Sequence, residues 1–252
     1  MAAAIKLLFS RALTPFIYAV LVAVWEAGAR GFHVPAWILP APSIIASTAI
    51  EWAPELAFHS LVTLRETVVG FFVALGLSVP LAIVIAFTSL TRRILYPILL
   101  GLQSVPKVAL APLVILWLGI GNLPKIVIVI LVCFFPILVN LVAGFEATPR
   151  AMLDLMHSLR ASRWAIFRRL RVPIATPYLF TGCKIAITFA VIGAVIGEFV
   201  AAQEGLGYLI LISTAQSQTP LAFAAIILLT VISVVLFYVI EFVERRLISW
   251  TP

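Results

Sequence analysis

Six long apolar segments constrain the fold of this chain more than any other feature of its sequence. They lie at about residues 13–31, 61–88, 94–119, 123–144, 174–201 and 220–243. Each is long enough to cross a bilayer, which takes about 20 mostly apolar residues. Only 11% of the residues are charged, whereas a soluble domain carries about 25%. The sequence therefore predicts an all-α integral membrane protein with six transmembrane helices.

A Pro-rich stretch, VPAWILPAPS at 34–43, separates the first span from the others. Proline lacks an amide donor and restricts the backbone, so a helix should not continue through this stretch. We therefore expect residues 1–60 to form an N-terminal transmembrane helix with an interfacial segment. Residues 61–246 would form the core of the protein.

The third span contains Pro106 and Pro112 with Lys107 between them, so we expect it to be broken or kinked. Irregular backbone at membrane depth requires protein or a water-filled cavity around it, which indicates a transport pathway. Gln103 and Ser104 are polar and come just before the break. They could line that pathway or form hydrogen bonds between helices.

The positive charges predict the orientation of the spans. If the N-terminus is cytoplasmic, the Lys and Arg clusters of both termini, of the second loop and of the fourth loop all lie inside, as the positive-inside rule requires. The first span also resembles a secretory signal, but Glu26, Ala27 and Gly28 form a poor cleavage site and five spans follow. We expect a multi-pass protein of the bacterial cytoplasmic (inner) membrane, with both termini in the cytoplasm.

The sequence offers no pattern typical of an enzyme or a metal site. The net charge of +7 follows from the orientation bias, so no nucleic-acid partner is expected. Cys133 and Cys183 fall inside predicted spans and are interpreted as small buried apolar residues. The chain has no phosphate loop of the form G-x-x-x-x-G-K-[ST]. We expect no enzymatic activity, no metal site and no cofactor bound by this chain.

The fourth loop, about 146–173, carries six arginines and no lysine. Thr148 could cap a helix with Pro149 at its first position, and a second helical pattern follows Ser162. In the first helix, four residues recur at helical spacing and form an apolar stripe: Met152, Leu155, Met156 and Leu159. Two amphipathic helices could lie on lipid or dock into a groove of a partner protein, and the pattern alone does not decide between them.

This loop resembles the EAA loop of binding-protein-dependent ABC transporter permeases, in the nitrate, sulfonate and taurine group of type I importers. Counting back from Pro173, the E-A-A positions are Asp154-Leu155-Met156, and Arg160 stands where the family has glycine. Asp154, Arg160 and Val172 depart from the family pattern. Further segments match in the family's order and spacing: WILPAPSII at 37–45, TLRETVVGF at 63–71, SVPKVALAPLVILWLGIG at 104–121, FFPILVN at 134–140 and EGLGYLI at 204–210.

The resemblance implies the MetI-like ABC permease fold with a cytoplasmic coupling helix. It implies a second permease copy, with a homodimer favoured over a heterodimer, two ABC ATPase subunits that use ATP and Mg, and a substrate-binding protein. The substrate would be a small anion such as nitrate, a sulfonate or taurine, or a nutrient resembling a vitamin precursor. The residues expected to couple the permease to the ATPase are Asp154, Leu155, Met156, His157, Ser158, Leu159, Arg160, Ala161, Ser162, Arg163 and Pro173.

Charged residues within spans are costly and are usually functional or paired. Lys184 and Glu198 lie in the fifth span, about 21 Å apart along a helix, so they cannot pair directly. Lys184 could reach the cytoplasmic surface or act near the loop, and Glu198 could line an outer gate or reach the outer surface. The predicted pathway or gate residues are Gln103, Ser104, Pro106, Lys184 and Glu198.

Two other pairs of charges lie near predicted span ends. Glu26 and Arg30 are four residues apart on the first span and should pair locally. Arg65 and Glu66 open the second span and could contact a binding protein or anchor the helix at the interface.

A secondary transporter that relays protons through Glu26, Glu66 and Glu198 is the main alternative function. It would require inverted repeats or paired broken helices, which the sequence does not show. A membrane-anchored scaffold would leave the broken third span unexplained, and a membrane enzyme would lack a catalytic constellation.

Overall fold

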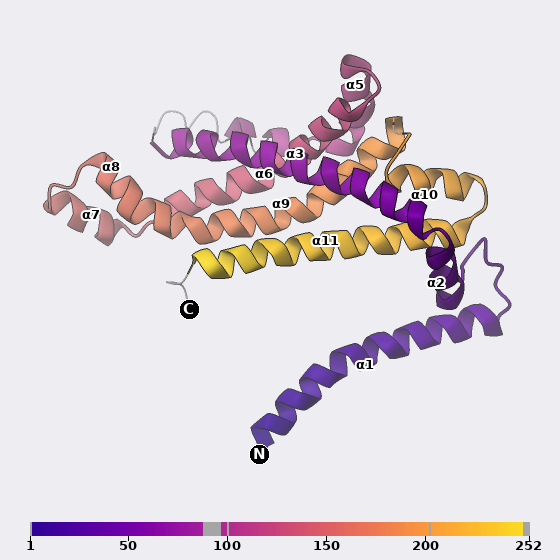
Figure 1. Ribbon diagram of the computed structural model, residues 1–252. Helices are drawn as coiled ribbons and strands as arrows, with labels where there is room; N and C mark the ends of the chain where they lie inside the picture. Colours follow the sequence, from indigo (N-terminus) through magenta and orange to yellow (C-terminus); the bar gives the residue numbers. More distant parts are fainter. Residues whose placement is uncertain (1, 88–96, 100, 202, 249–252) are drawn as a thin grey trace. The chain divides into compact units, whose positions relative to one another are not determined.

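The described part of the computed structural model is made of helices joined by turns and short loops, and it contains no strand (Figure 1). The structure describes the backbone of residues 2–87, 97–99, 101–201 and 203–248, and the side chains of these ranges from residue 15 onward, except that of residue 201. The predicted all-α class is confirmed.

The chain divides into two compact units, which we describe separately. Unit 1 comprises Met1–Phe58 and Leu209–Leu228, and unit 2 comprises His59–Tyr208 and Leu229–Pro252. Three helices have residues in both units: α3 (Ala53–Phe87), α10 (Leu206–Ala215) and α11 (Thr219–Leu247). Unit 1 also contains α1 (Ala2–Gly31) and α2 (Pro42–Glu51). Unit 2 also contains α5 (Lys107–Leu118), α6 (Asn122–Glu146), α7 (Arg150–Ser158), α8 (Arg163–Ile166), the π-helix η1 (Phe167–Arg171) and α9 (Val172–Ala201).

Four helices are long and apolar enough to cross a membrane. They are Ala53–Phe87, Asn122–Glu146, Arg163–Val200, in which α8, η1 and α9 run on without a break, and Thr219–Leu247. The predicted first span, at 13–31, lies within α1. The first side chains of α1 are outside the described part, so the role of α1 as a sixth transmembrane helix stays a prediction.

The third predicted span is broken, as its prolines predict, and forms either one bent span or a re-entrant loop. The short helix Pro97–Gln103 and α5 meet at an angle of 89°. Pro106 immediately precedes α5 in an extended conformation, with φ −68° and ψ 98°. Because proline has no amide hydrogen to donate, the helical hydrogen bonding is interrupted there. Residues 94–96 of the predicted span lie outside the described residues.

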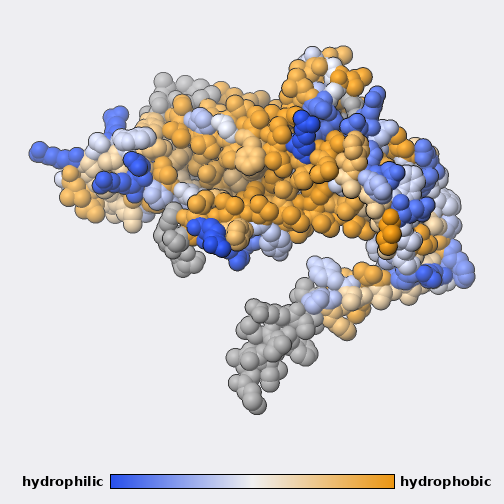
Figure 2. All heavy atoms as spheres, viewed as in Figure 1, coloured by the Kyte–Doolittle hydropathy of each residue, from blue (hydrophilic) through white to orange (hydrophobic). Residues whose placement is uncertain are grey.

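The surface of unit 2 is largely apolar along its long helices (Figure 2). Phe72 of α3 and Phe189 of α9 are exposed to solvent in the isolated chain, as is Tyr238 of α11. Continuous exposed apolar surface on this scale is unfavourable in water and typical of a surface that faces lipid or a partner. Hydrophilic side chains gather around α7 and α8 instead, at one end of this unit (Figures 1 and 2).

The core of unit 2 lies between α3, α6 and α9, and α6 and α9 pack extensively against each other. Small residues allow the close approach of these two helices. Ala186, Ala190 and Ala194 recur every four residues along α9 and are completely buried. A Cβ atom at Gly193 would lie 3.1 Å from Cα of Val129 on α6. Without a hydrophobic force between helices in lipid, such close van der Waals packing is what holds them together.

Cys133 and Cys183 both lie in this core as free, buried thiols. Their interpretation as small apolar residues is confirmed.

We predict that Gly193→Val will destabilise the protein by about 2 kcal/mol, because α6 backbone rather than a flexible side chain opposes the added methyl groups. Gly76→Val on α3 is the matched control, since a Cβ atom there would meet nothing within 4 Å. Thermal unfolding in detergent should show a lower midpoint for Gly193→Val only. Equal midpoints for the two variants would contradict the packing argument.

Candidate functional site

The arginine-rich loop between α6 and α9 folds into α7, α8 and η1. The second helical pattern, expected after Ser162, is α8. Ser162 caps it, with its side chain accepting a hydrogen bond from Ala165 N at 3.2 Å. The predicted cap at Thr148 is wrong. Its Oγ1 donates to Phe145 O at the end of α6, and Pro149 precedes α7, which begins at Arg150. The hydroxyl of Thr148 is therefore used by the preceding helix.

The apolar stripe of α7 is exposed. No residue of α7 is buried, and the exposed fractions of Met152, Leu155 and the following Leu159 are 49%, 59% and 69%. Met156 is half-buried. Large apolar side chains on an otherwise charged surface are typical of a site that contacts a partner or a membrane.

Most polar members of the predicted coupling set lie at the surface as well. The exposed ones are Asp154, His157, Ser158, Arg160, Ser162 and Arg163, while Ala161 and Pro173 are half-buried. Trp164 on α8 is also exposed. The structure thus presents most of the expected set on one loop, although its role in coupling stays a prediction.

Arg160 ends α7 in a left-handed conformation, with φ +52°. Ala161 N donates to Met156 O at 3.0 Å, and Arg160 N donates to His157 O at 2.9 Å. These two bonds form a Schellman motif, in which glycine is the usual left-handed residue. Arg160 therefore replaces the family's glycine but keeps the same left-handed turn. The backbone strain costs about 1 kcal/mol.

An aromatic cluster and one arginine fix the loop to the ends of α3 and α6. The buried ring of Phe167 lies 4.7 Å from that of Phe87 and 5.6 Å from that of Phe145, measured between centroids. Arg171 donates from Nη1 to Ala86 O at 3.1 Å. These anchors could not be predicted from the sequence, because the partners of Phe167 and Arg171 are distant in the chain.

The three predicted pathway residues around Pro106 lie where the third predicted span bends. Gln103, Ser104 and Pro106 are all exposed. Lys107 donates from Nζ to Gln103 O at 3.0 Å and lies over the ring of Phe135, 5.2 Å from its centroid. Lys107 thus links the two sides of the bend. That Gln103, Ser104 and Pro106 line a pathway stays a prediction.

Lys184 forms an ion pair with Glu244 of α11, with Nζ 2.7 Å from Oε2. This partner was not predicted, although the expectation that Lys184 and Glu198 do not pair directly is confirmed. The Lys184–Glu244 pair joins α9 to α11.

Glu198 is buried, so the alternative that it reaches the outer surface is wrong. Its carboxylate accepts hydrogen bonds from Thr63 Oγ1 at 2.7 Å and from Gly207 N at 2.6 Å. Leu206 N donates to Thr63 Oγ1, and Gly205 N donates to His59 Nδ1, both at 2.9 Å. Three consecutive amides at the start of α10 are thus satisfied by side chains, as the unpaired amides of a helix start require.

Gly205 makes this arrangement possible. Its φ is +113°, and a Cβ atom there would lie 2.1 Å from Oε1 of Glu198. The EGLG segment therefore places its glycine where both the backbone and the buried carboxylate exclude a side chain.

A buried ion pair joins Glu66 of α3 to Lys125 of α6. Each side chain is only 4% exposed, so the predicted roles of Glu66 as an interfacial anchor or a binding-protein contact are wrong. The pair was not predicted because its two members are 59 residues apart. Among the described residues, no group of three or more His, Cys, Asp or Glu side chains could hold a metal ion.

In unit 1, the predicted pairing of Glu26 with Arg30 is confirmed. Ser43 extends it, since Ser43 N donates to Glu26 Oε2 at 3.0 Å and Ser43 Oγ donates to Glu26 Oε1 at 2.7 Å. These bonds tie the end of α1 to the start of α2.

Comparison with known proteins gives consistent matches. Residues 78–249 match the family described as "Binding-protein-dependent transport system inner membrane component". The chain is 35% identical to the riboflavin transport system permease protein of Chloroflexus aurantiacus, over 94% of this chain and 89% of that protein. It is 34% identical to the formylaminopyrimidine transport permease protein of Halalkalibacterium halodurans, over 95% of this chain and 96% of that protein.

The fold is similar to that of a solved structure of the MetNI methionine ABC transporter in inward-facing conformations. The TM-score is 0.62 at 21% sequence identity, and the match covers 75% of this chain and 92% of that one.

We predict that Lys125→Met will destabilise the protein by about 3 kcal/mol, because it leaves the Glu66 carboxylate buried without a counter-charge. The double variant Glu66→Gln/Lys125→Met should regain most of this loss, since it leaves no unpaired charge. Thermal unfolding in detergent of Lys125→Met, of Glu66→Gln alone and of the double variant gives the coupling energy between Glu66 and Lys125. Additive losses would show that the two groups do not stabilise each other.

We predict that Arg160→Gly will stabilise the folded protein slightly, by up to about 1 kcal/mol, because glycine adopts the left-handed conformation without strain. Arg160→Val should be destabilising, since a β-branched side chain tolerates positive φ poorly. The midpoints of thermal unfolding should therefore rank glycine first, arginine second and valine last. The reverse order would mean that the guanidinium group outweighs the backbone conformation.

Proposed function

Because this chain belongs to the binding-protein-dependent transport system inner membrane components and has the MetI-like fold of ABC importer permeases, we propose that it carries a small solute from an external binding protein to the cytoplasm. It is a multi-pass protein of the inner membrane, as its family and its apolar helices show. We place the α7–α8 loop and both termini on the cytoplasmic side, following the distribution of Lys and Arg.

The exposed apolar stripe of α7 is the observation that best supports this proposal. It stands on a loop that Phe167 and Arg171 fix to the ends of α3 and α6. A docking surface attached in this way can transmit a partner's movement to membrane-spanning helices. A loop that merely lay on lipid would not need such anchoring.

In this proposal, the energy comes from two separate ABC ATPase subunits that use ATP and Mg, while this chain itself binds no cofactor. ATP binding brings the ATPase subunits together, and α7, seated in a cleft of one subunit, moves with it. ATP favours the outward-open state by binding it more tightly than the inward-open state. A second copy of this chain completes the pathway as a homodimer, and a substrate-binding protein delivers the solute.

We propose a nitrogen heterocycle related to a vitamin or its precursor as the solute. Relatives at 34–35% identity carry the names of riboflavin and formylaminopyrimidine transport, and both of these compounds are heterocycles. Of the two substrate classes implied by the family resemblance, this one is therefore favoured over small anions.

A proton-coupled carrier is less well supported. Of the carboxylates that could relay protons, Glu66 is paired with Lys125 and Glu198 accepts hydrogen bonds from Thr63 and Gly207. These contacts give both buried carboxylates a role in holding helices together.

We predict that Leu155→Glu will weaken the association of the permease with its ATPase subunit at least about tenfold, because it places a charge in an apolar contact. Solute-dependent ATP hydrolysis in proteoliposomes should fall accordingly. Leu155→Met is the matched control, since it keeps an apolar side chain of similar volume. Thermal unfolding of the isolated permease should be unchanged in both variants, because Leu155 is exposed.

Unchanged association and transport in Leu155→Glu would overturn docking through α7. Transport of solute by the purified permease alone, driven by a pH gradient, would overturn the ATP-driven mechanism as a whole.

A further inference from the structure

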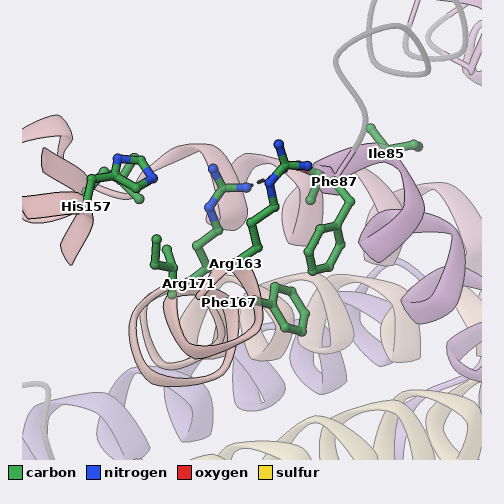
Figure 3. Close-up of a pocket in the computed structure, with 9 residues that line it drawn as sticks. Ile85, Phe87, His157, Arg163, Phe167 and Arg171 are labelled. Atoms are coloured by element: carbon green, nitrogen blue, oxygen red, sulfur yellow. Dashed lines mark hydrogen bonds between the residues drawn. The ribbon is translucent and has the colours of Figure 1, made fainter. Parts of the chain in front are cut away.

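A cavity of about 480 Å³ lies between the α7–α8 loop and the end of α3. Figure 3 shows the side chains that surround it. Phe87 comes from α3, and His157 comes from α7. Arg163, Phe167 and Arg171 line the cavity from the segment that leads into α9. A cavity of this size is within the range of small-molecule sites, about 300–1,000 Å³.

The lining combines positive charge with aromatic surface. Arg163 and Arg171 extend into the same open space between His157 and Phe87 (Figure 3). The nine described lining residues include no Asp or Glu. An anion that enters therefore meets two guanidinium groups, and the imidazole of His157, without a competing carboxylate in the lining.

Arg171 has a donor without an acceptor. Its Nη1 donates to Ala86 O, but its Nε is buried and has no hydrogen-bond partner in the described part of the chain. A buried polar group left in this state costs about 1–3 kcal/mol, more if it is charged.

A second cavity, of about 320 Å³, adjoins the first along Ala86, Leu153 and Arg171. It adds Arg150 and one carboxylate, that of Glu146. Arg171 thus stands between two open spaces, of which the first is the more positively charged.

We propose that the first cavity binds the phosphate headgroup of an anionic lipid. Phosphate offers several oxygens to the forked donors of arginine. The Phe87 and Phe167 rings and Ile85 provide an apolar wall for the glycerol and the first carbons of the acyl chains. Basic pockets beside membrane-spanning helices on the cytoplasmic side are suited to such headgroups.

The proposed cytoplasmic orientation places this cavity on the inner leaflet, and the inference rests on the proposed function in that respect only. A lipid bound here would contact α3, α7 and the start of α9 at once. It would therefore stabilise the loop in the position from which α7 meets its partner.

The test measures binding to the purified full-length chain in detergent by native mass spectrometry. The probes are phosphatidylglycerol, phosphatidylcholine and inorganic phosphate. We expect phosphatidylglycerol to bind in preference to phosphatidylcholine. Arg163→Gln and Arg171→Gln should each weaken phosphatidylglycerol binding at least about fivefold, as the loss of a charge-assisted hydrogen bond predicts.

Arg168→Gln is the matched control, because Arg168 is exposed on the same segment and is not in the lining of the cavity. It should bind phosphatidylglycerol as the unchanged protein does. Arg171→Gln also removes the bond to Ala86 O and could unfold the loop. Arg163 is exposed and makes no such bond in the described part of the chain, so Arg163→Gln keeps the test valid.

Equal losses in Arg163→Gln and Arg168→Gln would overturn the site, because they would indicate nonspecific attraction to basic residues. Binding of inorganic phosphate without preference for phosphatidylglycerol would overturn the assignment to lipid. Neither result would affect docking through α7, which Leu155→Glu tests separately. Conversely, lipid binding that survives the failure of α7 docking would leave this site intact.

Discussion

The close packing of α6 against α9 is the constraint on which the rest of unit 2 depends. Glycine and alanine on α9 bring its backbone against that of α6, and this contact leaves no room for a larger side chain at Gly193 or Gly197. The two helices thereby fix the ends of the loop that joins them. They also place Lys125 of α6 where it meets Glu66 of α3, so the position of one charge follows from the fit of two helices.

Buried and half-buried polar groups in unit 2 join helices that apolar packing alone would leave free to slide. The Glu66–Lys125 pair joins α3 to α6, Lys184–Glu244 joins α9 to α11, and Glu198 joins α9 to α3 and the start of α10. Each contact has a defined geometry, whereas methyl groups in contact have many positions of similar energy. The desolvation cost of these charges suits a role in specifying one arrangement of helices.

The sequence predicted those features that depend on local chemistry. Apolar length identified the long helices, Pro106 marked the break in the third predicted span, and the second helical pattern of the loop began after Ser162, where α8 begins. The apolar stripe of α7 also followed from residue spacing alone. What the sequence could not provide was the pairing of distant residues, such as Glu66 with Lys125 or Phe167 with Phe87, because it depends on how the helices pack. The hydroxyl of Thr148 also could not be assigned from the sequence. It could bond to the end of α6 or to the start of α7, and in the folded chain it bonds to α6.

The helix from Arg163 to Val200 continues the α8 end of the loop directly into α9. At about 1.5 Å per residue, 38 residues form a rod of about 57 Å. The π-helical turn η1 lies within this segment, and Pro177 stands inside α9. Both are typical positions for a bend in a long helix. The angle between the α8 end and the part of α9 that carries Glu198 can therefore change there without a break in the backbone.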